Sequence, residues 1–147
     1  MNWKIEKFND LTTNELYEIL RLRSEVFVVE QDCVYDDCDN KDQKAHHLFL
    51  EDNNKIIAGL RILNKGVSYD EISIGRVVVS KEYRKKGISR EMMRKAIDFI
   101  ENNLNENEIR ISAQAYLVNF YKSIGFKEVS KEYLEDNIPH IEMLYKK

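Results

Sequence analysis

The segment that most constrains this fold lies between residues 74 and 97, where a β-branched run, a glycine loop and an amphipathic helix follow one another. The run ends at Val79, and the loop is Arg84-Lys85-Lys86-Gly87-Ile88-Ser89. Its three cations and Arg90 crowd the predicted helix start, although a helix N-terminus carries partial positive charge and favours anions. Exposed N–H groups beside a glycine form a cradle for phosphate. The loop therefore predicts a site for a phosphorylated ligand.

Length and charge restrict the remaining possibilities. The 147 residues fit one domain, residues 1–147, and contain no linker. A net charge of −3 argues against a nucleic-acid partner. The apolar stretches are too short to cross a membrane, and the first residues lack the apolar core of a signal peptide. With only Cys33 and Cys38 present, we expect a cytoplasmic protein with two reduced thiols.

Hydrophobic periodicity predicts the order β-α-β-β-β-α-β-α-β-β, an α/β fold with a mixed sheet and helices on both faces. A capping box at Thr12 and Glu15 begins the first helix, and Gly125 ends the last one. The predicted strands span residues 2–8, 47–51, 55–63, 71–80, 108–115, 126–133 and 138–145. The predicted helices span residues 13–29, 88–103 and 117–124.

This order, with the 77–79 strand and the 84–89 loop, resembles the GCN5-related N-acetyltransferase (GNAT) superfamily. The superfamily's loop has Arg or Gln, two residues, Gly, one residue, then Gly or Ala; Arg84 and Gly87 match it, and Ser89 departs from it. Five further segments resemble its ElaA-like branch, namely residues 22–31, 75–77, 113–115, 119–126 and 138–141. The resemblance implies the acyl-CoA N-acyltransferase fold, whose central mixed sheet splays open between flanking helices.

The resemblance also implies an activity and a set of site residues. It indicates an acetyl-CoA-dependent N-acetyltransferase that acts on an amine of a small molecule or protein by direct transfer in a ternary complex. Tyr121 would be the general acid that protonates the leaving thiolate, and Asn119 would either contact the cofactor or cap the helix. The remaining cofactor-binding residues would be Val77, Val78 and Val79 for the pantetheine arm, and Arg84, Lys85, Lys86, Gly87, Ile88 and Ser89 for the pyrophosphate.

A general base is harder to identify from the sequence. Glu71 is the carboxylate nearest to the expected place before the splay, whereas Glu30 ends the first helix. His140, next to Pro139, is a third candidate because histidine titrates near neutrality. A free amine can also lose its proton to water, in which case no base is needed.

An acidic segment and two arginines remain to be explained. The segment contains Glu30, Asp32, Asp36, Asp37, Asp39 and Asp42. It is either a solvated loop or a wall of the acceptor pocket that attracts a cationic amine. Arg23 and Arg76 lie in apolar patterns and would need carboxylate partners. The candidate partners are Glu25, Glu30 and Glu71.

Two other functions compete with the enzyme. A non-catalytic CoA-binding or interaction module would explain the missing base and the departure at Ser89. A metal-binding module would use Cys33, Cys38, His46 and His47, but adjacent histidines on a strand point to opposite faces. We therefore predict no metal site and leave a homodimer open as an assembly.

Overall fold

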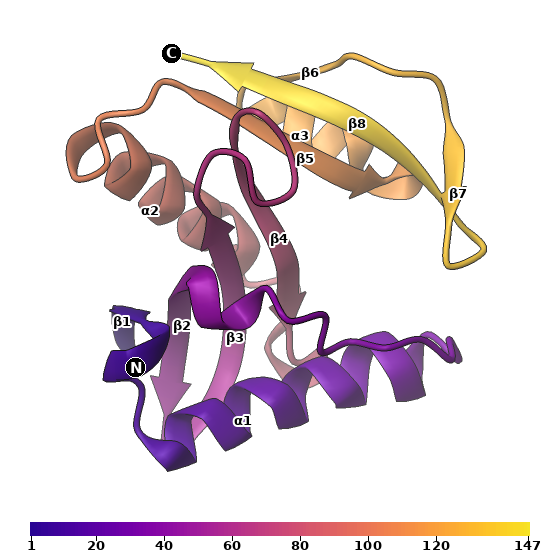
Figure 1. Cartoon of the computed structure of the whole chain (residues 1–147). Helices are drawn as coiled ribbons and strands as arrows, with labels where there is room; N and C mark the ends of the chain where they lie inside the picture. The colour runs from indigo at the N-terminus through magenta and orange to yellow at the C-terminus, as the bar shows by residue number, and fades with distance from the viewer.

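The computed structural model describes residues 1–147 (Figure 1). Its strands are β1 (Asn2–Lys7), β2 (Ala45–Asp52), β3 (Lys55–Leu63), β4 (Ile72–Val79), β5 (Glu108–Gln114), β6 (Phe126–Glu128), β7 (Tyr133–Glu135) and β8 (Ile138–Lys146). Its helices are α1 (Thr13–Arg23), α2 (Ile88–Asn102) and α3 (Val118–Ile124). None of these helices combines the length and the apolar character that crossing a membrane requires.

The strands form one mixed sheet, as the sequence predicts, but the sheet has eight strands where seven were predicted. The order is β1-β2-β3-β4-β5-β8-β6, and β7 pairs with β8. All neighbours are antiparallel except β4 and β5, which are parallel and joined through α2. A parallel pair requires such a crossover, which places α2 against one face of the sheet.

The sheet opens between its two halves. Strands β4 and β5 pair only at Ile72 with Ile109 and at Ser73 with Arg110. Beyond Ser73 the strands diverge, and Figure 1 shows β5 and β8 turned away from β2, β3 and β4. The outer part of β4 therefore has no strand partner on the β5 side.

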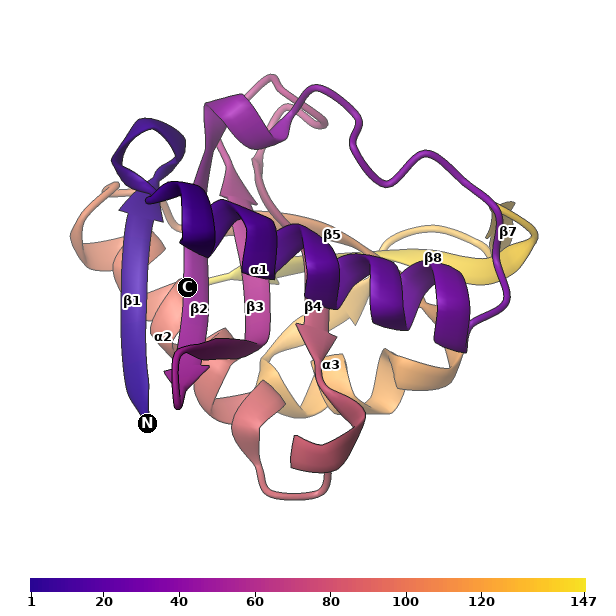
Figure 2. The ribbon, with the colours of Figure 1, turned by 90° about the horizontal axis from the view of Figure 1, so that it is seen from below.

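Helices cover both faces, and each has its own apolar core. Helix α1 crosses β2, β3 and β4 on one face (Figure 2), and its Ile19 and Leu22, with Val26 directly after the helix, pack against residues that include Val78. Helix α2 buries its predicted apolar face on the other side, in the larger core. The capping box is confirmed: Glu15 N donates to Thr12 Oγ1 at 3.0 Å, and Thr12 N donates to Glu15 Oε1 at 2.9 Å.

Two predicted elements differ in the structure. The first helix continues to Glu30, but its last seven residues, Ser24–Glu30, form a wider π-helical segment. The predicted strand 126–133 is divided into β6 and β7 because Ser130 interrupts the ladder. Its hydroxyl accepts the N–H of Glu142 at 2.9 Å, in place of a backbone carbonyl.

Candidate functional site

A cleft of about 1090 Å³ occupies the opening between β4 and β5. One wall consists of β4, the π-helical segment and the irregular chain that follows it. The opposite wall consists of the end of β5, helix α3 and the start of β8. The loop 83–90 closes one end. This location matches the opening that the resemblance implies.

A β-bulge shapes the inner wall. Gly59 of β3 pairs with Val78, but Arg61 pairs with Gly75, so β4 carries one extra residue opposite Leu60. Arg76 occupies the bulge with a φ of 52°, a left-handed conformation that is uncommon for a residue with a side chain. The sequence analysis missed this bulge, although a glycine inside a β-branched run is a signal for one.

The three valines of β4 divide their roles between side chain and backbone. Val78 is buried in the core beneath α1, and Val79 is buried in the core beneath α2. Val77 is partly buried against that second core. All three residues line the cleft, and their backbone has no strand partner on the β5 side; Val79 O accepts a hydrogen bond from Arg84 Nε. The side chains therefore pack while the backbone edge remains available to an extended ligand.

The start of α2 offers unpaired backbone donors. Gly87 is the N-cap, with a φ of 78°, and no side chain caps the helix. The first intrahelical bond runs from Glu91 N to Gly87 O at 3.1 Å, so the amides of Ile88, Ser89 and Arg90 lack intrahelical acceptors. A Cβ added to Gly87 would meet no protein atom within 4 Å. Gly87, Ile88 and Ser89 all line the cleft, and the space beside Gly87 is open to a ligand.

The three basic side chains of the loop lie differently. Arg84 lines the cleft and donates its Nε–H to Val79 O at 3.0 Å. Lys85 also lines the cleft and is exposed. Lys86 does not line it; its ammonium lies 5.4 Å from the centre of the Tyr83 ring.

Tyr121 is placed where a general acid could act. Its side chain lines the cleft and is only 6% exposed, with Phe120 and Phe126 packed edge-on against its ring. Its hydroxyl makes no hydrogen bond within the chain, and burial raises the pKa of this phenol. Asn119 is exposed and does not line the cleft.

The three candidate bases have different surroundings. Glu30 lines the cleft but accepts hydrogen bonds from Arg84, which lower the pKa of its carboxyl. Glu71 does not line the cleft; both its oxygens accept from Arg110 at 3.0 Å, which likewise lowers its pKa.

His140 lines the cleft and is 6% exposed. Its Nδ1 lies 2.6 Å from the carbonyl oxygen of Ile138. A carbonyl can only accept a hydrogen bond, so Nδ1 is the donor in this contact, and Nε2 is the nitrogen that carries the lone pair whenever the ring is neutral. Nε2 lies 3.5 Å from a carboxylate oxygen of Glu135.

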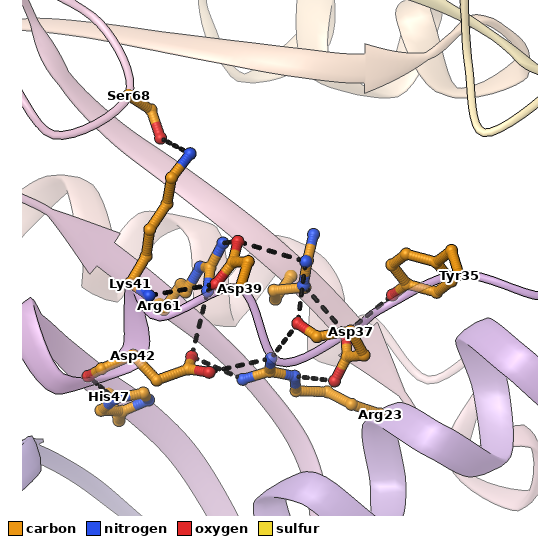
Figure 3. Close-up of polar contacts among 10 residues, drawn as sticks. Arg23, Tyr35, Asp37, Asp39, Lys41, Asp42, His47, Arg61 and Ser68 are labelled. Carbon is orange, nitrogen blue, oxygen red and sulfur yellow. Dashed lines mark hydrogen bonds and ion pairs between the residues drawn. The ribbon is translucent and has the colours of Figure 1, made fainter.

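The partners of the two inward arginines correct the sequence analysis. They are aspartates of the acidic segment, not Glu25, Glu30 or Glu71, as Figure 3 shows for Arg23. Arg23, 2% exposed, pairs with Asp37 at 2.8 Å and Asp42 at 2.7 Å. Arg76 pairs with Asp37 at 2.9 Å and Asp39 at 3.3 Å.

A third arginine, which the sequence analysis missed, completes this cluster. Arg61 of β3 binds Asp39 through Nη1 at 2.7 Å and Nη2 at 2.5 Å, and it reaches Asp42 at 3.1 Å. Its position inside the apolar run 56–63 was the available signal. Burial alone would raise the pKa of Asp39 and Asp42, but the arginines outweigh it and lower both. The carboxylates of Asp37, Asp39 and Asp42 are thus paired with arginines and are not free to attract a cation.

The cysteines and histidines do not come together. Cys33 and Cys38 are free thiols, and no three His, Cys, Asp or Glu side chains are grouped so that they could hold a metal ion. His47 is buried, with Nε2 2.9 Å from the carbonyl oxygen of Asp42. His46 instead packs on Phe99 of α2.

Comparisons with known proteins agree with this geometry. The acetyltransferase (GNAT) domain model matches residues 9–147. A UPF0039 protein of Schizosaccharomyces pombe is 41% identical over 138 residues, which cover 92% of this chain and 91% of that protein. Protein ElaA of Escherichia coli is 36% identical over 145 residues, which cover 97% of this chain and 95% of that protein.

Solved structures lead to the same family. The crystal structure of an acyl-CoA N-acyltransferase from Pseudomonas aeruginosa is 39% identical, covers 99% of both chains and gives a TM-score of 0.92. The crystal structure of E. coli ElaA gives a TM-score of 0.91 over 99% of this chain and 100% of that one. The chain therefore belongs to the GNAT acyltransferase family and, within it, to the ElaA-like branch.

Proposed function

We propose that this protein is an acetyl-CoA-dependent N-acetyltransferase that acts on an amine of a small molecule or protein. The observation that carries the proposal is the continuity of two backbone features in one cleft. The unpaired edge of β4 runs toward the uncapped start of α2, beside the open space at Gly87. An extended amide arm that ends in a pyrophosphate fits these donors and acceptors in that order.

The residues that would hold acetyl-CoA follow from this fit. The backbone of Val77, Val78 and Val79 would pair with the pantetheine amides. The amides of Ile88 and Ser89 would bind the pyrophosphate, with Lys85 and Arg84 supplying positive charge. Lys86 and Asn119 lie outside the cleft, so we assign them no direct contact. Bound there, acetyl-CoA would supply its acetyl group as a thioester.

The opposite wall would carry the proton transfers. The amine nitrogen of the acceptor forms the new C–N bond as the C–S bond breaks. His140 Nε2 would take the proton that the nitrogen loses, and the Glu135 carboxylate would then face the imidazolium. Tyr121 would give its hydroxyl proton to the leaving sulfur. Donor and acceptor sides belong to the same cleft, which supports direct transfer in a ternary complex.

An acceptor screen tests this function. The protein is mixed with acetyl-CoA and a panel of amines, and the release of free CoA thiol is followed. Acceptor-dependent release above the hydrolysis background is the expected result. Binding of acetyl-CoA without release for any amine would instead support the non-catalytic module.

A pair of variants then tests the base. His140→Gln should lower kcat by about 100-fold or more, whereas Glu71→Gln should leave it nearly unchanged. The reverse result would assign the role to Glu71, and equal activity of both variants would mean that the amine loses its proton to water.

A further inference from the structure

The charged side chains on the acceptor side of the cleft do not favour a cationic acceptor, which was one of the two interpretations of the acidic segment. Three arginines, Arg23, Arg61 and Arg76, face three aspartates, Asp37, Asp39 and Asp42, so this cluster is neutral by itself. Lys41, inside the same segment, adds one positive charge without a carboxylate partner. Its ammonium donates only to Ser68 Oγ, at 2.9 Å, as Figure 3 shows.

A second cation with spare donors lies in the same wall. Arg76 Nη2 donates to Asp37 O and to Asp39 Oδ2, and Nε lies 2.9 Å from Asp37 Oδ1 as an ion pair without a hydrogen bond. Its Nη1 has no partner within the chain. Its guanidinium also lies 5.4 Å from the centre of the Tyr35 ring. Arg76 and Lys41 both line the cleft. Guanidinium and ammonium groups with free N–H donors are suited to bind a carboxylate.

The facing wall carries the complementary charge. Glu135 lines the cleft, its side chain is 48% exposed, and it makes no ion pair with a lysine or arginine; His140 Nε2 lies 3.5 Å from it. Ser112 donates to it at 3.2 Å. Glu135 is therefore available to attract an ammonium group toward His140, where the proposed reaction needs it.

The two walls meet beside these groups. Ser68, the partner of Lys41, is followed by Tyr69, and the guanidinium of Arg110 lies 6.0 Å from the centre of the Tyr69 ring. Arg110 belongs to β5, the strand that also carries Ser112. Lys41 is thus linked through Ser68 and Tyr69 to the β5 wall, whose Ser112 contacts Glu135.

We infer that the acceptor is an amino acid, an amine that carries a carboxylate close to its amino group. The carboxylate binds Lys41 and the free Nη1 of Arg76, and the ammonium faces Glu135 and His140. This inference rests on the proposed function and names its substrate class. It replaces the cationic acceptor expected from the acidic segment.

Matched acceptors test the inference. Each amino acid is compared with the amine that lacks its carboxylate: L-phenylalanine with phenethylamine, and L-lysine with cadaverine. We expect kcat/KM to be at least about tenfold higher for the amino acid, because hydrogen bonds to a charged group contribute on that scale. Equal or better use of the amines would overturn the inference while leaving the proposed function intact.

Two variants test whether Lys41 contacts the carboxylate of the acceptor. Lys41→Gln removes the charge and shortens the side chain by one atom, and it should raise KM for the amino acid about tenfold while the amine is unaffected. Lys44→Gln, exposed and outside the cleft, is the matched control and should behave like the parent. An equal change for both acceptors would contradict a carboxylate contact.

A binding measurement separates this inference from the activity. Calorimetry on the CoA-saturated protein should detect L-phenylalanine or L-lysine binding that Lys41→Gln weakens. If thiol release fails for every amine but this binding occurs, the proposed function is wrong and the amino-acid site stands. If neither amino acid binds and neither is acetylated, the inference is wrong.

Discussion

Arg84 donates two hydrogen bonds to the carboxylate of Glu30, 54 residues away in the sequence, at 2.5 and 2.8 Å. The pair ties the loop before α2 to the end of the π-helical segment, across the rim of the cleft. One of the cations that crowd the helix start is thus already partnered by the protein. Glu30 would therefore compete with a bound pyrophosphate for the guanidinium of Arg84.

This pair predicts the behaviour of Glu30→Gln. Without the carboxylate, Arg84 is free for phosphate, and acetyl-CoA should bind about two- to fivefold more tightly, the scale of an exposed ion pair. Turnover should stay within about twofold. Glu25→Gln, which removes an ion pair with Arg21 outside the cleft, is the control. A fall in kcat of about 100-fold with unchanged affinity would identify Glu30 as the base instead.

Gly87 and Gly66 allow a controlled test of the cradle. Both have a positive φ, 78° and 85°, and neither has a protein atom within 4 Å of an added Cβ. Gly66 does not line the cleft. Replacing either glycine with alanine should lower the free energy of unfolding by about 1–2 kcal/mol. Only Gly87→Ala should weaken acetyl-CoA binding, by about tenfold or more, in a calorimetric titration. Equal affinity in the two variants would place the cradle elsewhere.

Tyr121→Phe tests the general acid. The hydroxyl makes no hydrogen bond within the chain, so its removal should change the unfolding free energy by less than about 1 kcal/mol. Turnover should fall by about 10²–10⁴-fold while acetyl-CoA still binds. Tyr145→Phe, which loses a hydrogen bond to Glu101 outside the cleft, should keep full activity. A fall of less than about threefold for Tyr121→Phe would mean that the thiolate leaves without protein assistance.

Arg21 and Arg23 lie two positions apart on α1, but only Arg23 is buried. Arg23→Met would leave Asp37 and Asp42 without a major partner and should destabilise the fold by about 3–5 kcal/mol in urea unfolding. Arg21→Met removes contacts to Glu18 and Glu25 from a side chain that is 33% exposed. That change should cost less than about 1 kcal/mol. Similar costs for the two variants would show that the aspartates remain paired or solvated without Arg23.

Acid should destabilise the protein in two stages. Burial lowers the pKa of His46 and His47 below 6.5, so the unfolded chain takes up these protons first and stability falls as the pH drops below 6.5. The pKa of Asp39 and Asp42 lies below 3.8, so their contribution is present above that value and is lost as the pH falls further. Urea midpoints at pH 7, 5 and 3.5 measure both stages. A midpoint that rises between pH 7 and pH 5 would contradict the first.

The sequence predicted the elements whose signals are local. The Thr12–Glu15 capping box lies within one helical turn, and Gly125 adopts a φ of 115° directly after α3. The glycine loop before α2 was likewise predicted from neighbouring residues. Such features need only neighbouring residues, because propensity, capping and backbone sterics act over a few positions.

The tertiary structure decided what the acidic segment and the inward arginines do. Arg23 meets Asp37 and Asp42 across 14 and 19 residues, and Arg76 meets Asp37 across 39. No local pattern selects among the aspartates and glutamates at such separations. Burial selects these partners, because a guanidinium removed from water is stable only where carboxylates contact it.

From the sequence alone we could predict most of the strands and helices and the glycine loop before α2, because periodicity and turn chemistry are encoded in adjacent residues. The folded structure was needed to show where β4 leaves β5, where Arg76 bulges and which charges remain unpaired in the cleft. These features depend on pairing between segments far apart in the chain. The packing of those segments pairs the aspartates with arginines and leaves Lys41 without a carboxylate partner.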